Sequence, residues 1–455
     1  MGLLAAHIND AGISVLDADK VLYRESGFAL LDDDKVTTGI DAVAQARVKP
    51  RRIQNNYWSD LQTQPLADSR FEHLSAADLV SRQLEQIWQR VATAQDQIIF
   101  AVPAYMGTEN LGLLLGIAAE LEVPVLAMVD AAVAATRREY LGAVPVHVDL
   151  SLHSTVITRI SQAGQAQVDR SAVVSDSGVV ALYEAWIALI AETFVQQSRF
   201  DPLHTAETEQ MLQDNLQEWL ASASANETVT LQIEYRGIRH EAEIEALELV
   251  AAAAPIYHRI VSNVRALYRA EETPALQLSD RAARMPGLAD ILTARVGGET
   301  FLQEPGATAR GLLSRCRDMQ AGERAVSLIR QLPWDQSPVE SGSAAVARQE
   351  GQPTHLLFNN RAFSIDAQAL TLGSQLNDGE RCIELLQDMP GVSRRHCSVR
   401  QESGQCIVRD YSRYGTFLNG HRIDGSAVLQ VGDLIRLGTP GYELRLITTA
   451  SDDGS

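Results

Sequence analysis

Side chains that could bind an anion lie close together near the C-terminal end of the chain. Ser393, Arg394 and Arg395 are consecutive, and Arg413 follows further along. A serine hydroxyl and guanidinium groups donate hydrogen bonds, which is what a phosphate dianion requires. Two interpretations of Arg395 and Arg413 stay open, because they could serve this site or be solvated surface cations. The residue types predict a phosphate-binding loop cluster.

The composition limits the classes of protein to consider. The 455 residues carry a net charge of −19, with 45% hydrophobic and 21% charged residues. Such a chain is expected to fold into globular domains, about two to four for this length. The acidity argues against a general binder of nucleic acid or of anionic membranes. Residues 352–447 hold ten Arg and ten acidic residues, so nearly all of the excess charge lies before them.

Targeting and metal-binding patterns are not seen in the sequence. The first ten residues lack the basic flank and the long apolar core of a signal peptide. Acidic residues and a proline interrupt the apolar stretch 111–135, so we expect no membrane insertion and a cytoplasmic location. The four cysteines show no CxxC spacing, and we interpret them as buried thiols. A metal site that uses His396 is the alternative, and we predict no metal.

Hydrophobic patterns predict a layered α/β arrangement in residues 1–333. Residues 5–30 are typical of a meander of three short strands. Ser75 and Asp78 form a capping-box pattern, and apolar residues then recur at helical spacing up to Val91. Apolar runs at 98–102 and 125–129 alternate with helical segments. This alternation indicates an α/β domain.

The opening pattern recurs from His147. HINDAGISVL at 7–16 and HVDLSLHSTV at 147–156 begin two stretches with the same order of strands and helices. The repeat predicts a duplicated α/β fold with a cleft between its halves. Residues 334–353 are typical of a linker, because small and polar residues replace apolar periodicity. Short strands with Gly and Asp turns follow over 354–448, as in an all-β sandwich.

Residues 1–333 resemble the actin-like (ribonuclease H-like) ATPases, specifically the nucleotide-binding domain of the DnaK-type heat-shock chaperones. IIFAVPAY at 98–105 resembles the family's strand ending in VPAY. LEVPVL at 121–126 and DAAVAA at 130–135 resemble its LEV…EPTAAA segment, and LQLSDRAARMP at 276–286 resembles its adenosine loop. The resemblance implies a duplicated actin-like α/β fold.

The same resemblance implies ATP and Mg as cofactors, held by glycine-rich loops and carboxylates. In the first phosphate loop only Asp10, slightly misplaced, could serve. In the second loop Asp149 is kept, but Ser-Leu-His replaces the glycines at 151–153. Ser279 and Asp280 replace the glycine pair of the adenosine loop and add a negative charge. We therefore predict a degenerate nucleotide site without catalytic residues or cofactor, and interpret Asp149 as a turn cap.

Residues 354–448 resemble the FHA domain, a β-sandwich that typically recognises phosphothreonine peptides through loops at one end. GVSRRH at 391–396 matches the family's Ser-Arg-x-His segment. DYSRYGTFLNG at 410–420 and VGDLIRLG at 431–438 match the two segments that follow in the family. The resemblance implies a phosphopeptide site at Ser393, Arg394, Arg395, Arg413, Thr416 and Asn419.

Two positions depart from the FHA pattern. Ser374 stands where the family's Gly-Arg motif has a phosphate-binding arginine, and Tyr414 stands where it has an asparagine. We therefore predict that phosphothreonine binds more weakly than in an FHA domain that keeps both. A phosphothreonine-containing partner and an unphosphorylated protein partner both stay open.

Two hypotheses of function follow. The first is a non-catalytic bacterial regulatory or assembly scaffold, in which a pseudo-ATPase domain holds one partner and the FHA module a second. The alternative is an ATP-dependent DnaK-like chaperone or switch that the FHA module targets. Binding of ATP with magnesium distinguishes the two.

Overall fold

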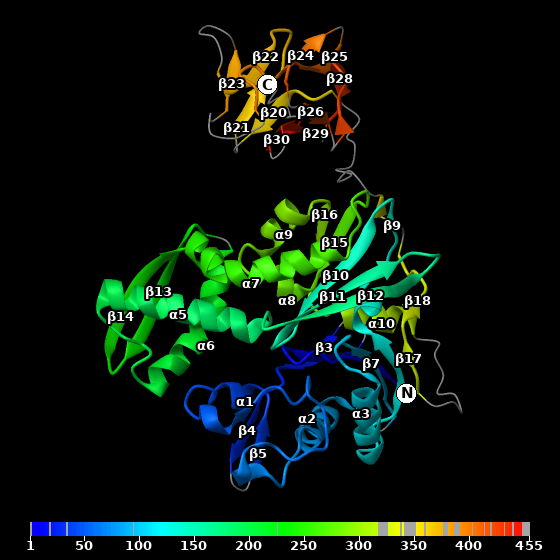
Figure 1. The fold of residues 1–455 in the computed structure, drawn as a ribbon, viewed down its shortest axis with the longest axis vertical. Helices are drawn as coiled ribbons and strands as arrows, with labels where there is room; N and C mark the ends of the chain where they lie inside the picture. Colours follow the sequence, from blue (N-terminus) through cyan, green and yellow to red (C-terminus); the bar gives the residue numbers. More distant parts are fainter. Residues whose placement is uncertain are drawn as a thin grey trace, which may run out of the picture. The chain divides into compact units, whose positions relative to one another are not determined.

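The computed structural model divides the chain into two compact units, Met1–Val339 and Glu340–Ser455 (Figure 1). Each unit is described separately. The described residues are 2–17, 20–32, 35–93, 95–224, 226–316, 326–336, 339–340, 352–358, 361–375, 381–385, 392–402, 404–413, 415–418, 421–431, 433–438 and 441–447.

The first unit opens with a six-stranded sheet of order β17-β8-β7-β1-β2-β3. The first three strands in sequence form the antiparallel meander predicted for residues 5–30, and three further strands extend the sheet in parallel. The strands are β1 Leu3–His7, β2 Ile13–Asp17, β3 Lys20–Glu25, β7 Gln97–Val102, β8 Val125–Asp130 and β17 Leu328–Ile329.

A second six-stranded sheet has the order β16-β15-β10-β11-β12-β18, and its first five strands in this order repeat the arrangement β8-β7-β1-β2-β3, whereas β18 pairs antiparallel with β12 at the other edge. Its meander is again antiparallel, and β15 and β16 again continue it in parallel. The strands are β10 Val144–Leu150, β11 Ser154–Ser161, β12 Ala166–Ser175, β15 Pro274–Leu278, β16 Glu299–Leu302 and β18 Gln331–Leu332. Because β1 and β10 hold equivalent places, the repeat that begins at His147 is present in the topology. We call the parts built on the two sheets the first and second halves.

Helices cover both faces of the first sheet. On one face, α2 (Ala76–Val91) and α3 (Thr108–Glu120) pack over Leu4 and Ala6. On the other face, α4 (Ala131–Ala135) and α10 (Ala307–Arg315) pack over Ala5. Alternate residues of β1 therefore enter opposite cores, as the period of a strand requires. The smaller elements of this half are β4 Ala29–Asp32, β5 Lys35–Thr38, α1 Ile40–Val43, η1 Pro50–Arg52, β6 Ile53–Gln54 and η2 Ser69–Phe71.

The capping box predicted at Ser75 is present. The Ser75 hydroxyl accepts the Asp78 N–H (3.3 Å), and the Asp78 carboxylate accepts the Ser75 N–H (2.7 Å). Both donors would otherwise lack an intrahelical partner, so the box defines where α2 begins.

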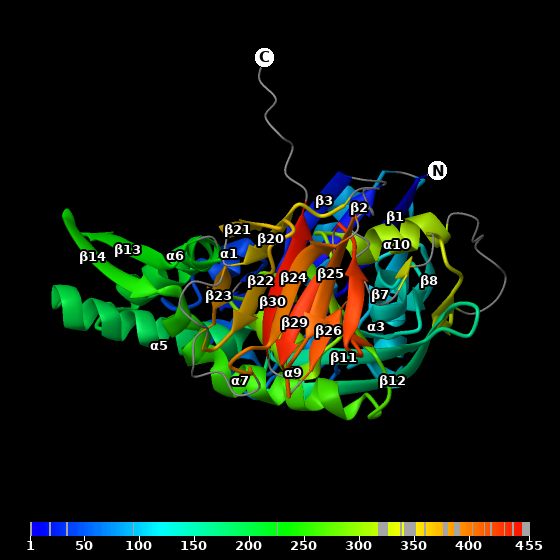
Figure 2. The ribbon, with the colours of Figure 1, turned by 90° about the horizontal axis from the view of Figure 1, so that it is seen from above.

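The second half carries a helical lobe, which Figure 2 shows projecting from the second sheet. A hairpin of two strands packs against α5 and α6 through Val229, Leu231 and Ile244. The lobe consists of α5 Val179–Ser198, α6 Ala206–Ala223, β13 Thr228–Tyr235, β14 Ile238–Glu245 and α7 Ala246–Ala266. Two further helices, α8 Asp280–Ala283 and α9 Leu288–Val296, follow β15.

Helix α5 is long and apolar enough, by length and composition alone, to cross a membrane. We predicted a helix near 179–197 from the sequence, and no membrane insertion. Its side chains Leu182, Trp186 and Phe194 are fully buried in the core of the second half.

The region predicted as a linker, 334–353, starts inside the first unit. Trp334 packs against the core next to α4 and α10, and the Asp335 carboxylate accepts a hydrogen bond from Arg137 (2.9 Å). Strand β19 (Val339–Glu340) pairs with β9 (Tyr140–Leu141). Residues 341–351 of the predicted linker lie outside the described residues. The first unit therefore extends to Val339, beyond the predicted boundary at residue 333.

The second unit consists of two packed sheets, of order β21-β20-β30-β29-β26-β27 and β23-β22-β24-β25-β28. Leu356, Leu372, Val399 and Leu446 lie in the core between them. The strands are β20 His355–Phe358, β21 Arg361–Ser364, β22 Leu370–Gly373, β23 Cys382–Glu384, β24 Cys397–Glu402, β25 Gln405–Asp410, β26 Thr416–Leu418, β27 His421–Arg422, β28 Ser426–Leu429, β29 Leu434–Gly438 and β30 Gly441–Ile447. The predicted strand-rich sandwich is confirmed.

The four cysteines are free thiols. Cys316, Cys397 and Cys406 are buried, as predicted, but the prediction is wrong for Cys382, which is exposed. Burial raises the pKa of the Cys406 thiol to about 12.

Candidate functional site

Two loops of the second unit are joined by the Ser393 side chain. The first loop lies between β23 and β24, and the second lies between β25 and β26. The Ser393 hydroxyl accepts the backbone N–H of Arg413 across them (3.0 Å). The structure therefore brings together the serine and the arginine that the sequence analysis selected.

His396 connects the two loops through hydrogen bonds of its two ring nitrogens. Its fully buried imidazole accepts the Ser393 N–H at Nδ1 (3.1 Å), so the proton resides on Nε2, which donates to the Gly415 carbonyl (3.1 Å). Burial lowers the pKa of His396, which favours this neutral form. Both ring nitrogens of His396 are thus used in hydrogen bonds within the loop cluster, which is the structural role that the family resemblance implies.

Gly373 allows the first loop to lie against the end of β22. A Cβ atom at this position would come within 1.9 Å of the Arg394 carbonyl oxygen. The next residue, Ser374, donates its N–H to the Ser393 carbonyl (3.1 Å). Position 374 is half-buried and therefore adjoins the serine of the candidate site.

Thr416 does not contribute to the surface of the site. Its side chain is fully buried, and its hydroxyl donates to the Asp410 carboxylate (2.8 Å). Asp410 also accepts the Ser412 N–H (2.9 Å), and the Ser412 hydroxyl accepts the Gly415 N–H (2.7 Å). The Thr416 hydroxyl, which we predicted to be a peptide ligand, is therefore already used in the core of the turn.

The three arginines of the site differ in the interactions that their guanidinium groups make. The guanidinium of Arg395 lies 4.7 Å from the ring centroid of Tyr411, a cation–π contact. The exposed guanidinium groups of Arg394 and Arg413 have no hydrogen bond or ion pair within the part of the chain that the structure describes. Asn419 lies outside the described residues.

Residues 370–438 match the FHA domain. This match covers both loops and confirms the family predicted for the C-terminal region. FHA domains bind phosphothreonine-containing partners, so this part of the chain is a protein-interaction module. No curated protein matches the chain, and the first unit has no match to a protein family.

The first unit holds a separate cluster of buried charges between its halves. Asp149, at the end of β10, pairs with Arg281 of α8, whose Nη2 lies 3.1 Å from Oδ2. Asn9 Nδ2 donates to the same oxygen (2.7 Å). Burial alone would raise the pKa of Asp149, but the Arg281 charge, the two neighbouring histidines and a hydrogen bond from Ser279 together outweigh burial and hold this pKa well below its usual range. Asp149 is therefore a buried anion that the protein itself neutralises.

The turns after β1 and β10 use their backbone N–H groups within the protein. The Gly12 N–H donates to the Asn9 carbonyl, and the Leu152 N–H donates to the Asp10 carboxylate (both 2.8 Å). The first two N–H groups of α5 donate to the carbonyls of Ser151 and Leu152 (both 2.9 Å). A phosphate-binding loop needs free backbone N–H groups. Because these turns use theirs within the protein, those groups are not free to donate to an anion.

Asp280 does not leave an unpaired negative charge. Its carboxylate accepts hydrogen bonds from Arg24 (2.7 Å) and Arg284 (2.9 Å). The repulsion that we predicted from Asp280 is therefore offset by two guanidinium groups. Ser279 caps α8 by accepting the Ala282 N–H (3.3 Å).

Arg281 was missed by the sequence analysis. It contacts both halves, because its guanidinium also donates to the Leu150 and Gly12 carbonyls (3.2 and 3.3 Å). The sequence gives no local signal for it, because Asp280 and Arg284 are charged residues of the same short segment and are not buried in the same way. Among the described residues, no group of three or more His, Cys, Asp and Glu is arranged to hold a metal ion.

We predict that Asp10→Asn stabilises the first unit only above about pH 4. Asp10 Oδ2 is buried without a hydrogen-bond partner, and burial raises the pKa of Asp10 from 3.8 to about 6. Folding therefore becomes less favourable as the pH rises through this window, because the folded state holds a proton that the unfolded state releases. An asparagine at position 10 stays uncharged and does not incur this cost. The gain in the free energy of unfolding of Asp10→Asn over wild type should therefore grow to the order of 3 kcal/mol by pH 7. Urea denaturation at pH 4, 5, 6 and 7 measures the difference, and a constant difference would contradict the prediction.

Proposed function

We propose that this chain is a non-catalytic scaffold of bacterial type, whose FHA domain binds a protein partner that carries phosphothreonine. The observation that carries the proposal is the loop cluster around Ser393. Its hydroxyl joins the two loops, and the guanidinium groups of Arg394 and Arg413 beside it are exposed. Arginine beside a hydroxyl suits a phosphate dianion, because charge-assisted bonds to phosphate are the stronger ones.

The partner is best sought with the full chain as bait. We expect it to retain phosphothreonine proteins from a cell lysate, and phosphatase treatment of the lysate should abolish their capture. Arg394→Ala should reduce capture, whereas Arg400→Ala, at a guanidinium paired with Glu402 (2.9 Å), should not. Mass spectrometry identifies the captured phosphopeptides. A partner that survives phosphatase would instead support the unphosphorylated mode of binding.

For the first unit we propose a degenerate actin-like domain that does not use ATP. The repeated strand order of its two sheets supports the duplicated fold. The pairing of Asp149 with Arg281 and the internal use of the turn N–H groups support the loss of nucleotide chemistry. In this proposal the unit serves as a rigid binding surface for a second partner.

ATP with magnesium should not stabilise the first unit. A ligand that binds the native state must raise the melting temperature. All five tryptophans of the chain lie in residues 1–339, so their fluorescence reports on this unit during heating. We expect the same melting temperature with and without ATP and magnesium, and no phosphate release. A saturable, magnesium-dependent rise in melting temperature would overturn the proposal and favour the ATP-dependent switch.

A further inference from the structure

A cavity of about 340 Å³ lies between the two halves of the first unit. One wall comes from the segment around α1, and the other comes from α5 and α6, which face α1 in Figure 1. Volumes from about 300 Å³ upward with mainly apolar walls are typical of small-molecule sites. The apolar lining includes Phe28, Val43, Ile53, Leu152, Val179 and Tyr183.

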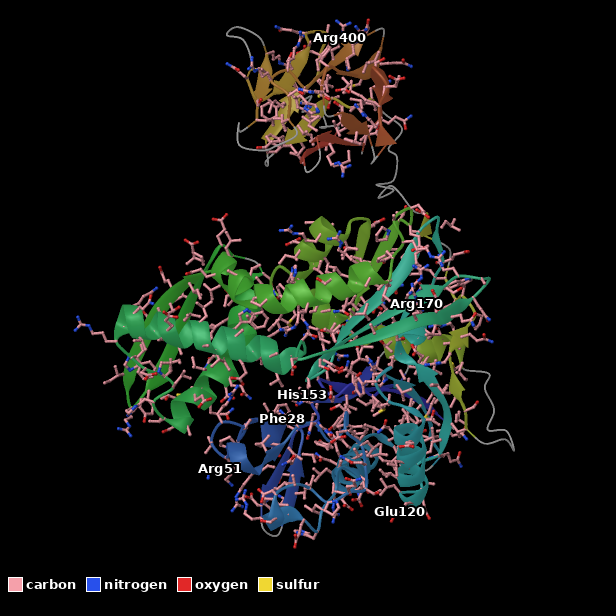
Figure 3. All side chains as sticks on the ribbon, viewed as in Figure 1. Phe28, Arg51, Glu120, His153, Arg170 and Arg400 are labelled. Atoms are coloured by element: carbon pink, nitrogen blue, oxygen red, sulfur yellow. The ribbon has the colours of Figure 1, made fainter. Side chains whose placement is uncertain are left out.

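A wider cleft of about 820 Å³ shares Val43, Val179 and Tyr183 with this cavity. Phe28 and His153, both labelled in Figure 3, come from the first and second halves. The His153 ring lies 3.1 Å from the Asn55 side-chain oxygen, across the junction. Both halves therefore build the cavity, and its size depends on how closely they approach.

Arg47 lines the cavity and bridges the two halves. It comes from the first half, and its side chain donates to Glu184 of α5 and to Glu209 (3.1 Å) and Gln213 (2.6 Å) of α6. Its backbone N–H donates to Gln210 (2.8 Å). These four residues of the second half bind one arginine, so separating the two halves at this point requires several hydrogen bonds to break together.

The polar lining of the cavity disfavours a charged occupant. Arg47 is already paired with two carboxylates, and no other cation lines this cavity among the described residues. An anion would meet Glu184 and Glu209 without a free cation beside them, and a cation would have to compete with Arg47 for these two carboxylates. The remaining polar groups are neutral, chiefly the amides of Gln213 and Gln217.

We propose that this cavity binds an uncharged, mainly apolar small molecule, and that Arg47 closes its entrance. The aliphatic and aromatic walls supply the favourable burial of apolar surface. The amides of Gln213 and Gln217 supply neutral donors and acceptors that orient the bound molecule. This binding site is independent of the FHA domain.

Aminoanthracene, an uncharged three-ring dye whose fluorescence rises in apolar surroundings, is the probe. We expect saturable binding to the full chain, and loss of at least about tenfold in affinity in Val43→Trp, which fills the shared wall. Val173→Trp is the matched control, since Val173 is 44% exposed on β12 and does not line the cavity. Equal affinity in wild type and Val43→Trp, or no binding to wild type, would overturn the proposal.

The role of Arg47 is tested by stopped-flow mixing with the same dye. Arg47→Gln should speed association about tenfold, because the closed state loses its ion pairs. Arg82→Gln, at an exposed pair within α2, should leave the rate unchanged. An unchanged rate in Arg47→Gln overturns the gate. Displacement of the dye by ATP, or equally tight and Val43-dependent binding of anilinonaphthalene sulfonate, overturns the uncharged ligand class.

Discussion

Replacement of Arg394 by alanine is expected to weaken the binding of a phosphothreonine peptide about tenfold or more. The guanidinium of Arg394 is exposed beside Ser393, and its carbonyl is held by the N–H of Gln375 (3.1 Å), so the backbone that carries it is fixed. A charge-assisted hydrogen bond is worth roughly 1.5–3 kcal/mol, which corresponds to this loss of affinity. Titration of the full chain with a peptide selected from a phosphothreonine library measures it.

Arg400→Ala controls for the loss of one positive charge on the same domain and should bind as wild type does. Added salt should weaken wild-type binding more than that of Arg394→Ala, because the lost interaction is ionic. Equal affinities of Arg394→Ala and wild type would remove Arg394 from the site.

Ser374→Arg should have the opposite effect and strengthen binding about tenfold. The Ser374 N–H donates to the Ser393 carbonyl (3.1 Å), so a longer side chain at this position starts next to the proposed phosphate. Ser374→Gln controls for side-chain length without the charge. If no phosphopeptide binds wild type or Ser374→Arg while a partner protein still does, the FHA domain recognises an unphosphorylated surface.

Arg281→Ala is expected to destabilise the first unit by about 3–5 kcal/mol, because it leaves a buried charge unpaired. Asp149 is 4% exposed, and Arg281 is its only cationic hydrogen-bond partner among the described residues. The same change also removes the guanidinium bonds to the Leu150 and Gly12 carbonyls, of which the second joins the two halves. Urea denaturation followed by tryptophan fluorescence measures the free energy of unfolding of this unit.

Arg284→Ala is the matched control for Arg281→Ala. Arg284 lies on the same segment, but its guanidinium is largely exposed and pairs with Asp280, so its loss should cost no more than about 1 kcal/mol. The double change Arg281→Met with Asp149→Leu should recover much of the stability, since it removes both buried charges. Equal unfolding free energies of Arg281→Ala and Arg284→Ala would contradict the role given to the buried pair.

Local sequence patterns were enough to predict the elements whose structure depends on residues that are close together in the chain. The capping box at Ser75 and Asp78 can be recognised from four consecutive residues, because its hydrogen bonds satisfy donors of the same helix turn. The motifs around Ser393 and Asp410 likewise located the FHA domain, because its loops carry characteristic residues at fixed spacing. The boundary at residue 333 was less accurate, since the place of Trp334 depends on a core assembled from distant segments.

The sequence by itself determined the α/β and all-β regions, the repeat and the serine and arginines of the loop cluster, because periodicity and motif spacing are local properties. Only the tertiary structure decided that Thr416 is buried, that Arg281 neutralises Asp149 and that Arg47 spans the two halves. Arg281 lies 132 residues from Asp149 along the chain, and Arg47 lies 162 residues from Glu209. The physical reason is that burial and charge pairing depend on which segments meet in space, and the spacing of residues along a chain does not contain that information.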